Sequence, residues 1–504
     1  MLACIVNLVA LPWSDVNLLV VTDVHSWIAG HKHPDHAPVL DADYGHVLSL
    51  FERLASSAAA GGRDLFLLQN GDLNDGTGYS RVPPLALVPL LQRLPFAALT
   101  TGNHELYKNE VIDYLARPGG FVQSWAGGFL TSNVLNATTR EPIGARYKLL
   151  VGRNSGVRLL CFGFLYTMRD HDDHIVVAAV EDVVKEMWFV DALSTASYDA
   201  LLFLAHMGFD DRLVDVLHDA VRALVGWSVP IQFLTGHTHI RAYRKLDEQA
   251  ASFEAGHYMD TVGFASFALS TSAQAFHHVN IEANVAAMAA AAGLRNASAL
   301  QTPSGAALQH EIRRTASALG LDRVLGCSPR SFGTYQPLAA PDSLWGLYLR
   351  NVTAAQVLGG NHSKVVVEST GSLRYNLFAG EVTVNDVCTM APFEDAYWRV
   401  ATHVSGDDLA SVLGALEARG FEGRRGLPEL GAASLPSYAT TSTPVSGCVY
   451  ELWTLSFDLV RVVAAFEAQT GQVANPKMML DGANTTSVWI SWITEYWPCL
   501  WRVA

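Results

Sequence analysis

Short apolar runs alternate with amphipathic segments through the first half of the chain. The runs are rich in Val, Leu, Ile and Phe and have the length of buried strands. They are Val16–Thr22, Asp64–Gln69, Phe96–Thr100, Arg158–Leu165, Leu201–Ala205 and Ile231–Thr235. Between them, apolar residues recur at helical spacing, as in the segment from Leu213 to Leu224. Strands that alternate with helices predict an α/β domain, in which helices cover a sheet.

The chain is long enough for more than one domain. It has 504 residues, of which half are hydrophobic, and this is a globular composition. An alanine-rich stretch follows the α/β pattern and predicts a helical linker at residues 281–322. We therefore expect a catalytic domain at residues 14–280 and a second domain at residues 323–504, which contains the strand-like run Lys364–Glu368.

Polar motifs directly follow the apolar runs. They are Asp23-Val24-His25, Gly71-Asp72-Leu73-Asn74-Asp75, Gly102-Asn103-His104-Glu105, the single His206, and Gly236-His237-Thr238-His239. In open α/β sheets, binding sites form beyond the carboxyl ends of the strands, where the loops converge. Each motif is therefore placed where an active site is expected.

The side chains in these motifs suit metal ions. Carboxylate and imidazole groups together favour Mn, Fe, Zn or Co. Two such ions, about 3.5–4 Å apart, can hold a phosphoryl group between them. Asp72 is the candidate for a bridging carboxylate, because the glycine before it lets the backbone pack closely around it. His237 and His239 are two residues apart, so an extended backbone would place both rings on one face.

The order of these motifs resembles that of the calcineurin-like metallophosphoesterases, over Val16–Ala242. The likeness is closer to the 5'-nucleotidase group, and GNHELY, GFL and GHTHIR resemble a fungal and protist branch of nucleotidases. The resemblance implies an α/β fold with a calcineurin-like β-sandwich flanked by helices. It also implies that an α/β C-terminal domain of the 5'-nucleotidase type follows.

The resemblance implies a site with two divalent metal ions, for which Mn, Zn, Fe and Co are candidates. The predicted metal ligands are Asp23, His25, Asp72, Asn103, His206, His237 and His239. His104 would protonate the leaving oxygen or stabilise its charge. Asp75 would orient His104, as in the phosphoprotein-phosphatase branch; the alternative is that Asp75 only caps its turn.

Two segments of the second domain resemble substrate-binding elements of the nucleotidases. Gly371–Arg374 resembles the family's N-G-G-x-I-R segment, although Ser-Thr-Gly-Ser stands where Asn-Gly-Gly is usual. Met390–Phe393 resembles the L-P-F element, whose phenylalanine stacks on the base. The resemblance thus implies Arg374 and Phe393 as substrate-binding residues. In the family, a second aromatic that stacks on the base precedes a Gly-Gly-Asp turn, and this turn is not recognisable in the sequence.

These features predict a hydrolase that releases phosphate from a 5'-nucleotide by attack of a metal-activated water. The alternatives are a phosphodiester or pyrophosphate substrate, such as a UDP-sugar, and an inactive binding or scaffold protein on the same fold. A net charge of -14 disfavours nucleic acid as a partner and leaves a small phosphoester as the expected ligand. The oligomeric state stays open.

The location of the protein is indicated by weaker features. The six cysteines are scattered along the chain, and no two of them form the C-x-x-C pair that is typical of a zinc finger. Five N-x-S/T sequons begin at Asn136, Asn296, Asn351, Asn361 and Asn484. The apolar segment Met1–Leu11 is either a truncated signal peptide or a first strand, and no apolar stretch is long enough to span a membrane. The sequons favour secretion or an endomembrane lumen, while a cytosolic location stays open.

Overall fold

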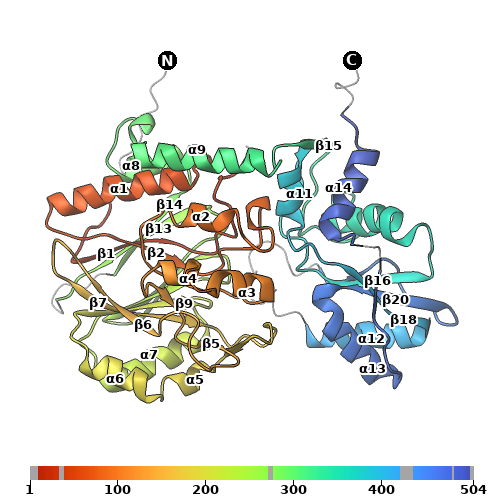
Figure 1. Ribbon diagram of the computed structural model, residues 1–504, viewed down its shortest axis with the longest axis horizontal. Helices are drawn as coiled ribbons and strands as arrows, with labels where there is room; N and C mark the ends of the chain where they lie inside the picture. Colours follow the sequence, from red (N-terminus) through yellow and green to blue (C-terminus); the bar gives the residue numbers. More distant parts are fainter. Residues whose placement is uncertain (1–9, 33–38, 271–275, 421–434, 480–481, 500–504) are drawn as a thin grey trace. The chain divides into compact units, whose positions relative to one another are not determined.

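A computed structural model describes residues 10–32, 39–270, 276–420, 435–479 and 482–499 (Figure 1). Most of the apolar segment Met1–Leu11, expected to be a signal peptide or a first strand, lies outside these residues. The chain forms two compact units. Unit 1 comprises Met1–Asp75 and Tyr79–Thr315, and unit 2 comprises Gly76–Gly78 and Ala316–Ala504.

Two six-stranded sheets form the centre of unit 1. The first has the order β14 (His277–Glu282), β13 (Thr261–Phe267), β1 (Val16–Val21), β2 (Phe66–Asn70), β3 (Phe96–Thr100) and β4 (Phe129–Leu130). The second has the order β11 (Arg241–Asp247), β12 (Ala250–Ala255), β10 (Ile231–Thr235), β9 (Ala200–His206), β7 (Arg158–Leu165) and β6 (Tyr147–Val151). Parallel pairing of β2 with β1 and β3, and of β9 with β7 and β10, brings their carboxyl ends to one edge of each sheet.

One apolar core lies between the two sheets, and a second lies between the second sheet and the helices that cover its other face. Alternate residues of β9 face opposite ways, as the period of a strand requires. Leu202 and Leu204 pack in the core with β1, whereas Leu201 and Phe203 pack with the helices. Those helices are α5 (Val180–Val183), α6 (Met187–Thr195) and α7 (Arg212–Val225), drawn at the bottom of Figure 1. Unit 1 is therefore a β-sandwich flanked by helices.

Further helices lie outside the first sheet of unit 1 or in its connections, and two of them, Gly78–Ser80 and Pro303–Ala318, include residues of unit 2. They are α1 (Tyr44–Ala60), η1 (Gly78–Ser80), α2 (Leu87–Leu91), α3 (Asn109–Ala116), α4 (Phe121–Ser124), α8 (Val285–Ala291), η2 (Ala297–Ala299) and α9 (Pro303–Ala318), and β5 (Val134–Asn136) pairs with β8 (Ile175–Val177). The predicted linker, residues 281–322, contains α8, η2 and α9. The hydroxyl of Ser49 in α1 contacts Thr302 at 3.3 Å, and a Cβ on Gly45 would lie 2.4 Å from the carbonyl oxygen of Gly305. Close packing with α1 thus begins at the start of α9.

Unit 2 has its own sheet and its own core. The five-stranded sheet has the order β19 (Tyr438–Thr440), β16 (Lys364–Ser369), β20 (Val449–Leu455), β18 (Tyr397–Ser405) and β21 (Lys477–Met478), and β15 (Val324–Ser328) pairs with β17 (Gly380–Thr383). The helical segments are α10 (Leu344–Leu347), the π-helix η3 (Tyr348–Leu358), α11 (Val384–Met390), α12 (Gly406–Arg419), η6 (Ser456–Asp458), α13 (Leu459–Thr470) and α14 (Thr485–Tyr496). Side chains of α12 and α13 pack on β16, β18 and β20 to form the core.

A disulfide joins the first strand of unit 2 to the segment after α14. Cys327 and Cys499 are 172 residues apart, so the bond encloses nearly the whole of unit 2. Cys161 and Cys388 are buried and lie outside this disulfide, and Cys448 is an exposed free thiol. Among the residues that the structure describes, no helix is both long and apolar enough to cross a membrane.

Loss of the Cys327–Cys499 bond is predicted to destabilise unit 2. A cross-link over a long loop lowers the entropy of the unfolded chain, so Cys499→Ser should lower the free energy of unfolding by about 2–5 kcal/mol. Calorimetry of the oxidised protein would show this as a lower melting temperature. Cys448→Ser changes an exposed free thiol and should leave the transition in place. A Cys499→Ser variant as stable as the parent would contradict the prediction.

Candidate metal centre

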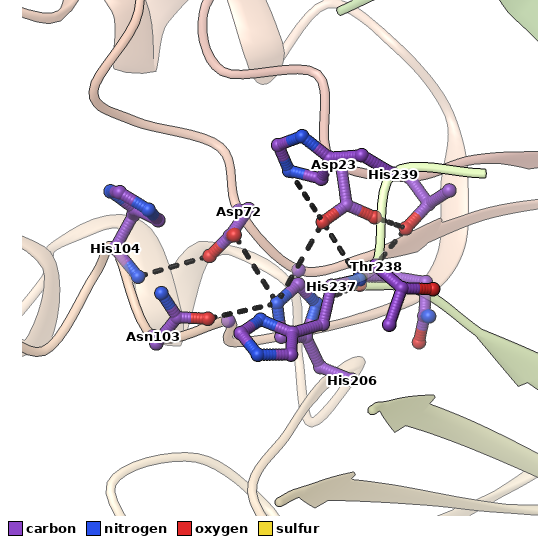
Figure 2. A network of polar contacts seen from close by, with 12 residues as sticks. Asp23, Asp72, Asn103, His104, His206, His237, Thr238 and His239 are labelled. Carbon is purple, nitrogen blue, oxygen red and sulfur yellow. Dashed lines mark hydrogen bonds and ion pairs between the residues drawn. The ribbon is translucent and has the colours of Figure 1, made fainter. Parts of the chain in front are cut away.

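Seven side chains from five strand ends meet in unit 1 (Figure 2). They are Asp23 and His25 after β1, Asp72 after β2, Asn103 after β3, His206 at the end of β9, and His237 and His239 after β10. Parallel pairing within each sheet aligns these strand ends. The positions expected as metal ligands from the sequence therefore lie in one cluster.

One half of the cluster consists of Asp23, His25, Asp72 and His239, whose ligand atoms all lie within 4.8 Å of one another. His25 Nε2 is 3.4 Å from Asp72 Oδ2 and 3.2 Å from His239 Nε2. His239 Nε2 is 3.6 Å from Asp23 Oδ1. Both carboxylates and His25 are buried, so water offers them little solvation. This group has the donor atoms of a transition-metal site.

The other half shares Asp72 with the first and adds His206 and His237. Figure 2 shows the His206 ring between Asp23, Asp72 and Asn103. Its Nε2 is 3.2 Å from Asp72 Oδ2, 3.2 Å from Asn103 Oδ1 and 3.8 Å from Asp23 Oδ1. Because Asp72 belongs to both groups, its carboxylate is placed where a ligand common to two ions would have to lie.

Two imidazole rings turn their Nε2 atoms into the cluster. His206 Nδ1 lies 2.8 Å from the carbonyl oxygen of Asn70, and His25 Nδ1 lies 2.9 Å from that of Asn74. Each Nδ1 therefore donates a hydrogen to a carbonyl oxygen, so Nε2 of each ring faces the cluster and offers a lone pair when it carries no proton. Metal-binding histidines are commonly oriented in this way. Lone pairs that face carboxylate oxygens and another imidazole nitrogen repel one another unless positive charge lies between them.

The ionisation of the cluster points to the same need. Burial opposes charge on His206, but Asp72 and Asp23 raise its pKa to about 10. Burial raises the pKa of Asp23 to about 7. Burial would also raise the pKa of Asp72, yet His206, His104 and His25 hold it well below its ordinary range. A divalent cation would supply positive charge to these carboxylates and imidazole nitrogens together. The residues present therefore fit a divalent metal.

Most of the clustered residues have a left-handed backbone. The φ values are 49° at Asp23, 46° at His25, 51° at Asp72, 77° at His237 and 63° at His239. Each such residue costs on the order of 1–3 kcal/mol and persists only where its surroundings enforce it. Our expectation that an extended backbone places His237 and His239 on one face is wrong. A sharp turn after β10 brings both rings to the cluster.

Two glycines allow the ligand loops to touch. A Cβ on Gly71 would lie 2.5 Å from His206 Nδ1, and a Cβ on Gly102 would lie 2.1 Å from Asp72 Oδ1. No side chain fits at either place, because real Cβ contacts are essentially never shorter than 3.0 Å. The close packing that the sequence predicts before Asp72 is thus present in the structure.

Glu105 connects the Asp72 loop to the Asn103 loop. Its Oε1 accepts hydrogen bonds from the backbone N–H groups of Leu73 and Asn74, at 2.8 and 3.0 Å. Its Oε2 accepts from Asp72 and Gly102, at 3.1 and 2.8 Å. The side chain is buried, which raises the pKa of Glu105 to about 7. The sequence shows this residue in the GNHE motif, but we assigned it no role there.

Glu254 makes the corresponding connection in the second sheet. It lies in β12 and accepts hydrogen bonds from the backbone of Phe209, after β9, and from the backbone of Ile240, after β10. The Thr238 hydroxyl donates to the same carboxyl group at 2.7 Å. Burial raises the pKa of Glu254 to about 8. Sequence reasoning missed Glu254, although a single acid inside the small and apolar run AASFEA could have indicated it.

His104 lies at the edge of the cluster with its expected partner. Its Nδ1 is 3.0 Å from Asp75 Oδ2, and its backbone N–H donates to Asp72 Oδ1 at 2.9 Å. Asp75 therefore contacts the histidine ring and does more than cap its turn. Tyr107, which the sequence did not single out as a site residue, accepts a hydrogen bond from Asn103 Nδ2 at 3.0 Å. This bond fixes the amide so that its oxygen faces His206.

Arg374 and Phe393 lie together in unit 2. The guanidinium carbon is 5.9 Å from the centroid of the Phe393 ring. Phe457 faces Phe393 with a centroid distance of 6.5 Å and an interplanar angle of 12°. This spacing is close to twice the roughly 3.4 Å between stacked bases. The sequence analysis did not single out Phe457, which lies two residues beyond the end of β20.

Two segments of the chain match known protein families. Residues 16–241 match the calcineurin-like phosphoesterase family, and residues 332–443 match the family described as NAD nucleotidase, C-terminal domain. The 5'-nucleotidase of Candida albicans has the same fold, with a TM-score of 0.84, 22% identity and coverage of 97% of this chain and 99% of that chain. The predicted fold class is confirmed.

Two sequence relatives are fungal. An uncharacterized protein of Schizosaccharomyces pombe is 27% identical over 86% of this chain and 76% of its own length. A secreted protein of Arthroderma benhamiae is 25% identical over 77% of this chain and 65% of its own length. From the two family matches, residues 16–241 belong to the calcineurin-like phosphoesterases, and a C-terminal domain of the NAD-nucleotidase type follows them.

Proposed function

We propose that the chain is a two-metal phosphomonoesterase that acts on 5'-nucleotides. The observation that carries this proposal is that the Asp72 carboxylate belongs to both groups of candidate metal ligands. Asp23, His25, Asp72 and His239 would hold one ion, and Asp72, Asn103, His206 and His237 would hold the other. When bound, two divalent ions supply positive charge against the phosphoryl oxygens and a nucleophile at neutral pH.

His104 would act on the leaving group. Asp75 accepts a hydrogen bond from Nδ1 of His104, and this bond orients the ring. Nε2 can then donate a proton to the oxygen that leaves the phosphorus. The backbone bond from His104 to Asp72 keeps this group next to the cluster. Asp75 is therefore a positioning residue, and His104 is the proposed general acid.

Recognition of the nucleoside is assigned to unit 2. The gap between the parallel rings of Phe393 and Phe457 suits a planar base, because each face of the base would then lie against one ring. Arg374 beside Phe393 offers a planar cation for phosphate or hydroxyl oxygens.

Competent donors at all seven ligand positions weigh against an inactive scaffold.

We also propose that the protein is made in the secretory pathway. The Cys327–Cys499 disulfide suits an oxidising compartment, since disulfides are rare in the cytosol. A relative described as secreted supports the same location.

Removal of metal should abolish hydrolysis, and Mn, Co or Zn should restore it. Asp72→Asn should lose more activity than Asp23→Asn, because only the Asp72 carboxylate belongs to both groups. The assay should compare nucleoside monophosphates with a phosphodiester and a UDP-sugar on the same reloaded protein. Equal and small losses from the two variants would exclude a bridging role. Preference for the diester or the UDP-sugar would replace the proposed substrate.

Asp75→Asn should lower kcat by about 10–100-fold, because His104 loses the carboxylate that orients it. Metal content, measured by mass spectrometry of the elements, should stay at the parent level. His104→Ala should lower kcat by roughly 10²–10⁴-fold with the same metal content. If Asp75→Asn lost metal in proportion to activity, Asp75 would support the metal ligands rather than the general acid.

Phe457→Ala should raise KM for a nucleoside monophosphate. Loss of one stacking face costs about 1–3 kcal/mol, which corresponds to roughly 5–150-fold in affinity. Hydrolysis of glycerol phosphate, which has no base, should be unaffected. Val460→Ala changes an exposed side chain nearby and serves as the control. An equal loss on both substrates would show that Phe457 supports the fold and does not bind the base.

A further inference from the structure

The five N-x-S/T sequons have two kinds of surroundings. Asn136, Asn296 and Asn361 are exposed, and so are the hydroxyl residues two positions later. The other two sequons, at Asn351 and Asn484, have buried hydroxyl residues, with Thr353 0% and Thr486 2% exposed. Asn351 itself is exposed and Asn484 is half-buried, so burial of the hydroxyl residue is what separates these two sequons from the three accessible ones.

The three accessible sequons share one local geometry. In each, the asparagine Oδ1 accepts a hydrogen bond from the backbone N–H of the hydroxyl residue. The distances are 3.0 Å from Thr138 to Asn136, 3.1 Å from Ser298 to Asn296 and 3.0 Å from Ser363 to Asn361. This is the Asx turn, in which the side chain folds over the next two residues. The hydroxyls of Ser298 and Ser363 also donate to Oδ1, at 3.0 and 2.7 Å.

The other two sequons belong to longer helices, whereas Asn296 caps only the three-residue segment η2. Asn351 lies within the π-helix η3. Asn484 caps α14, where its Oδ1 accepts a hydrogen bond from Ser487 at 2.8 Å, and the Thr486 hydroxyl donates to the carbonyl oxygen of Ala391. An Asx turn needs only three consecutive residues, so it can form before the domain folds. At Asn351 and Asn484 the local backbone favours helix instead.

We propose that Asn136, Asn296 and Asn361 carry N-linked glycans and that Asn351 and Asn484 do not. The modification requires the secretory location proposed above, and it does not depend on the catalytic activity. The donor is a lipid-linked oligosaccharide diphosphate. A bond forms between the asparagine Nδ2 and the anomeric carbon, the bond from that carbon to the diphosphate oxygen breaks, and the amide loses one proton.

Peptide mapping of the full chain, secreted from a eukaryotic host behind a signal peptide of that host, tests the proposal. Enzymatic deglycosylation in heavy-oxygen water converts each glycosylated asparagine into an isotope-labelled aspartate. We expect the label at residues 136, 296 and 361 and unmodified asparagine at residues 351 and 484. Label at none of the first three, or equal label at residues 351 and 484, would overturn the proposal.

Adjacent threonines provide a matched control. Thr138→Ala removes the sequon hydroxyl of Asn136, so the glycan at this position should be lost completely. Thr139→Ala changes an exposed neighbour but leaves the sequon intact, so the glycan should remain. Both variants change one exposed threonine in the same turn, and a difference in stability between them is not expected. Loss of the glycan in both variants would contradict recognition of the Asn136 sequon through the Thr138 hydroxyl.

Discussion

Hydrogen bonds from backbone N–H groups to two buried carboxyl groups hold the metal-binding loops in place. Glu105 accepts four such bonds and connects the loops after β2 and β3. Glu254 connects the loops after β9 and β10. Because several clustered residues have a left-handed backbone, the loops would relax without these connections. The two acids thus keep in place the side chains that meet between the sheets.

The convergence of ligands creates a site that favours a cation. Asp23 and Asp72 are buried beside imidazole rings whose Nε2 atoms face them. Packing so many acceptors together is unfavourable by itself, since buried charges need partners. His206 can provide one positive charge as a proton, and divalent ions can provide more at the same place. Metal binding and the stability of these loops are therefore coupled.

Much of the site could be anticipated because each motif follows a strand, and parallel strands bring their carboxyl ends together. The same logic could not reveal Glu254, which lies within β12 and acts through backbone atoms of loops distant in sequence. Nor could it reveal Phe457, because the ring that it faces, that of Phe393, is distant in sequence and is brought near only by the fold of unit 2. The turn at His237 and His239 escaped prediction because alternation assumes an extended backbone.

Anomalous diffraction from crystals soaked in Mn²⁺ tests the central claim most directly, because it locates the ions independently of any substrate. The account predicts two peaks about 3.5–4 Å apart, with an oxygen of Asp72 as a ligand to both. It also predicts Asp23, His25 and His239 around one peak and Asn103, His206 and His237 around the other. A single peak, or two peaks without a common ligand at Asp72, would contradict the account.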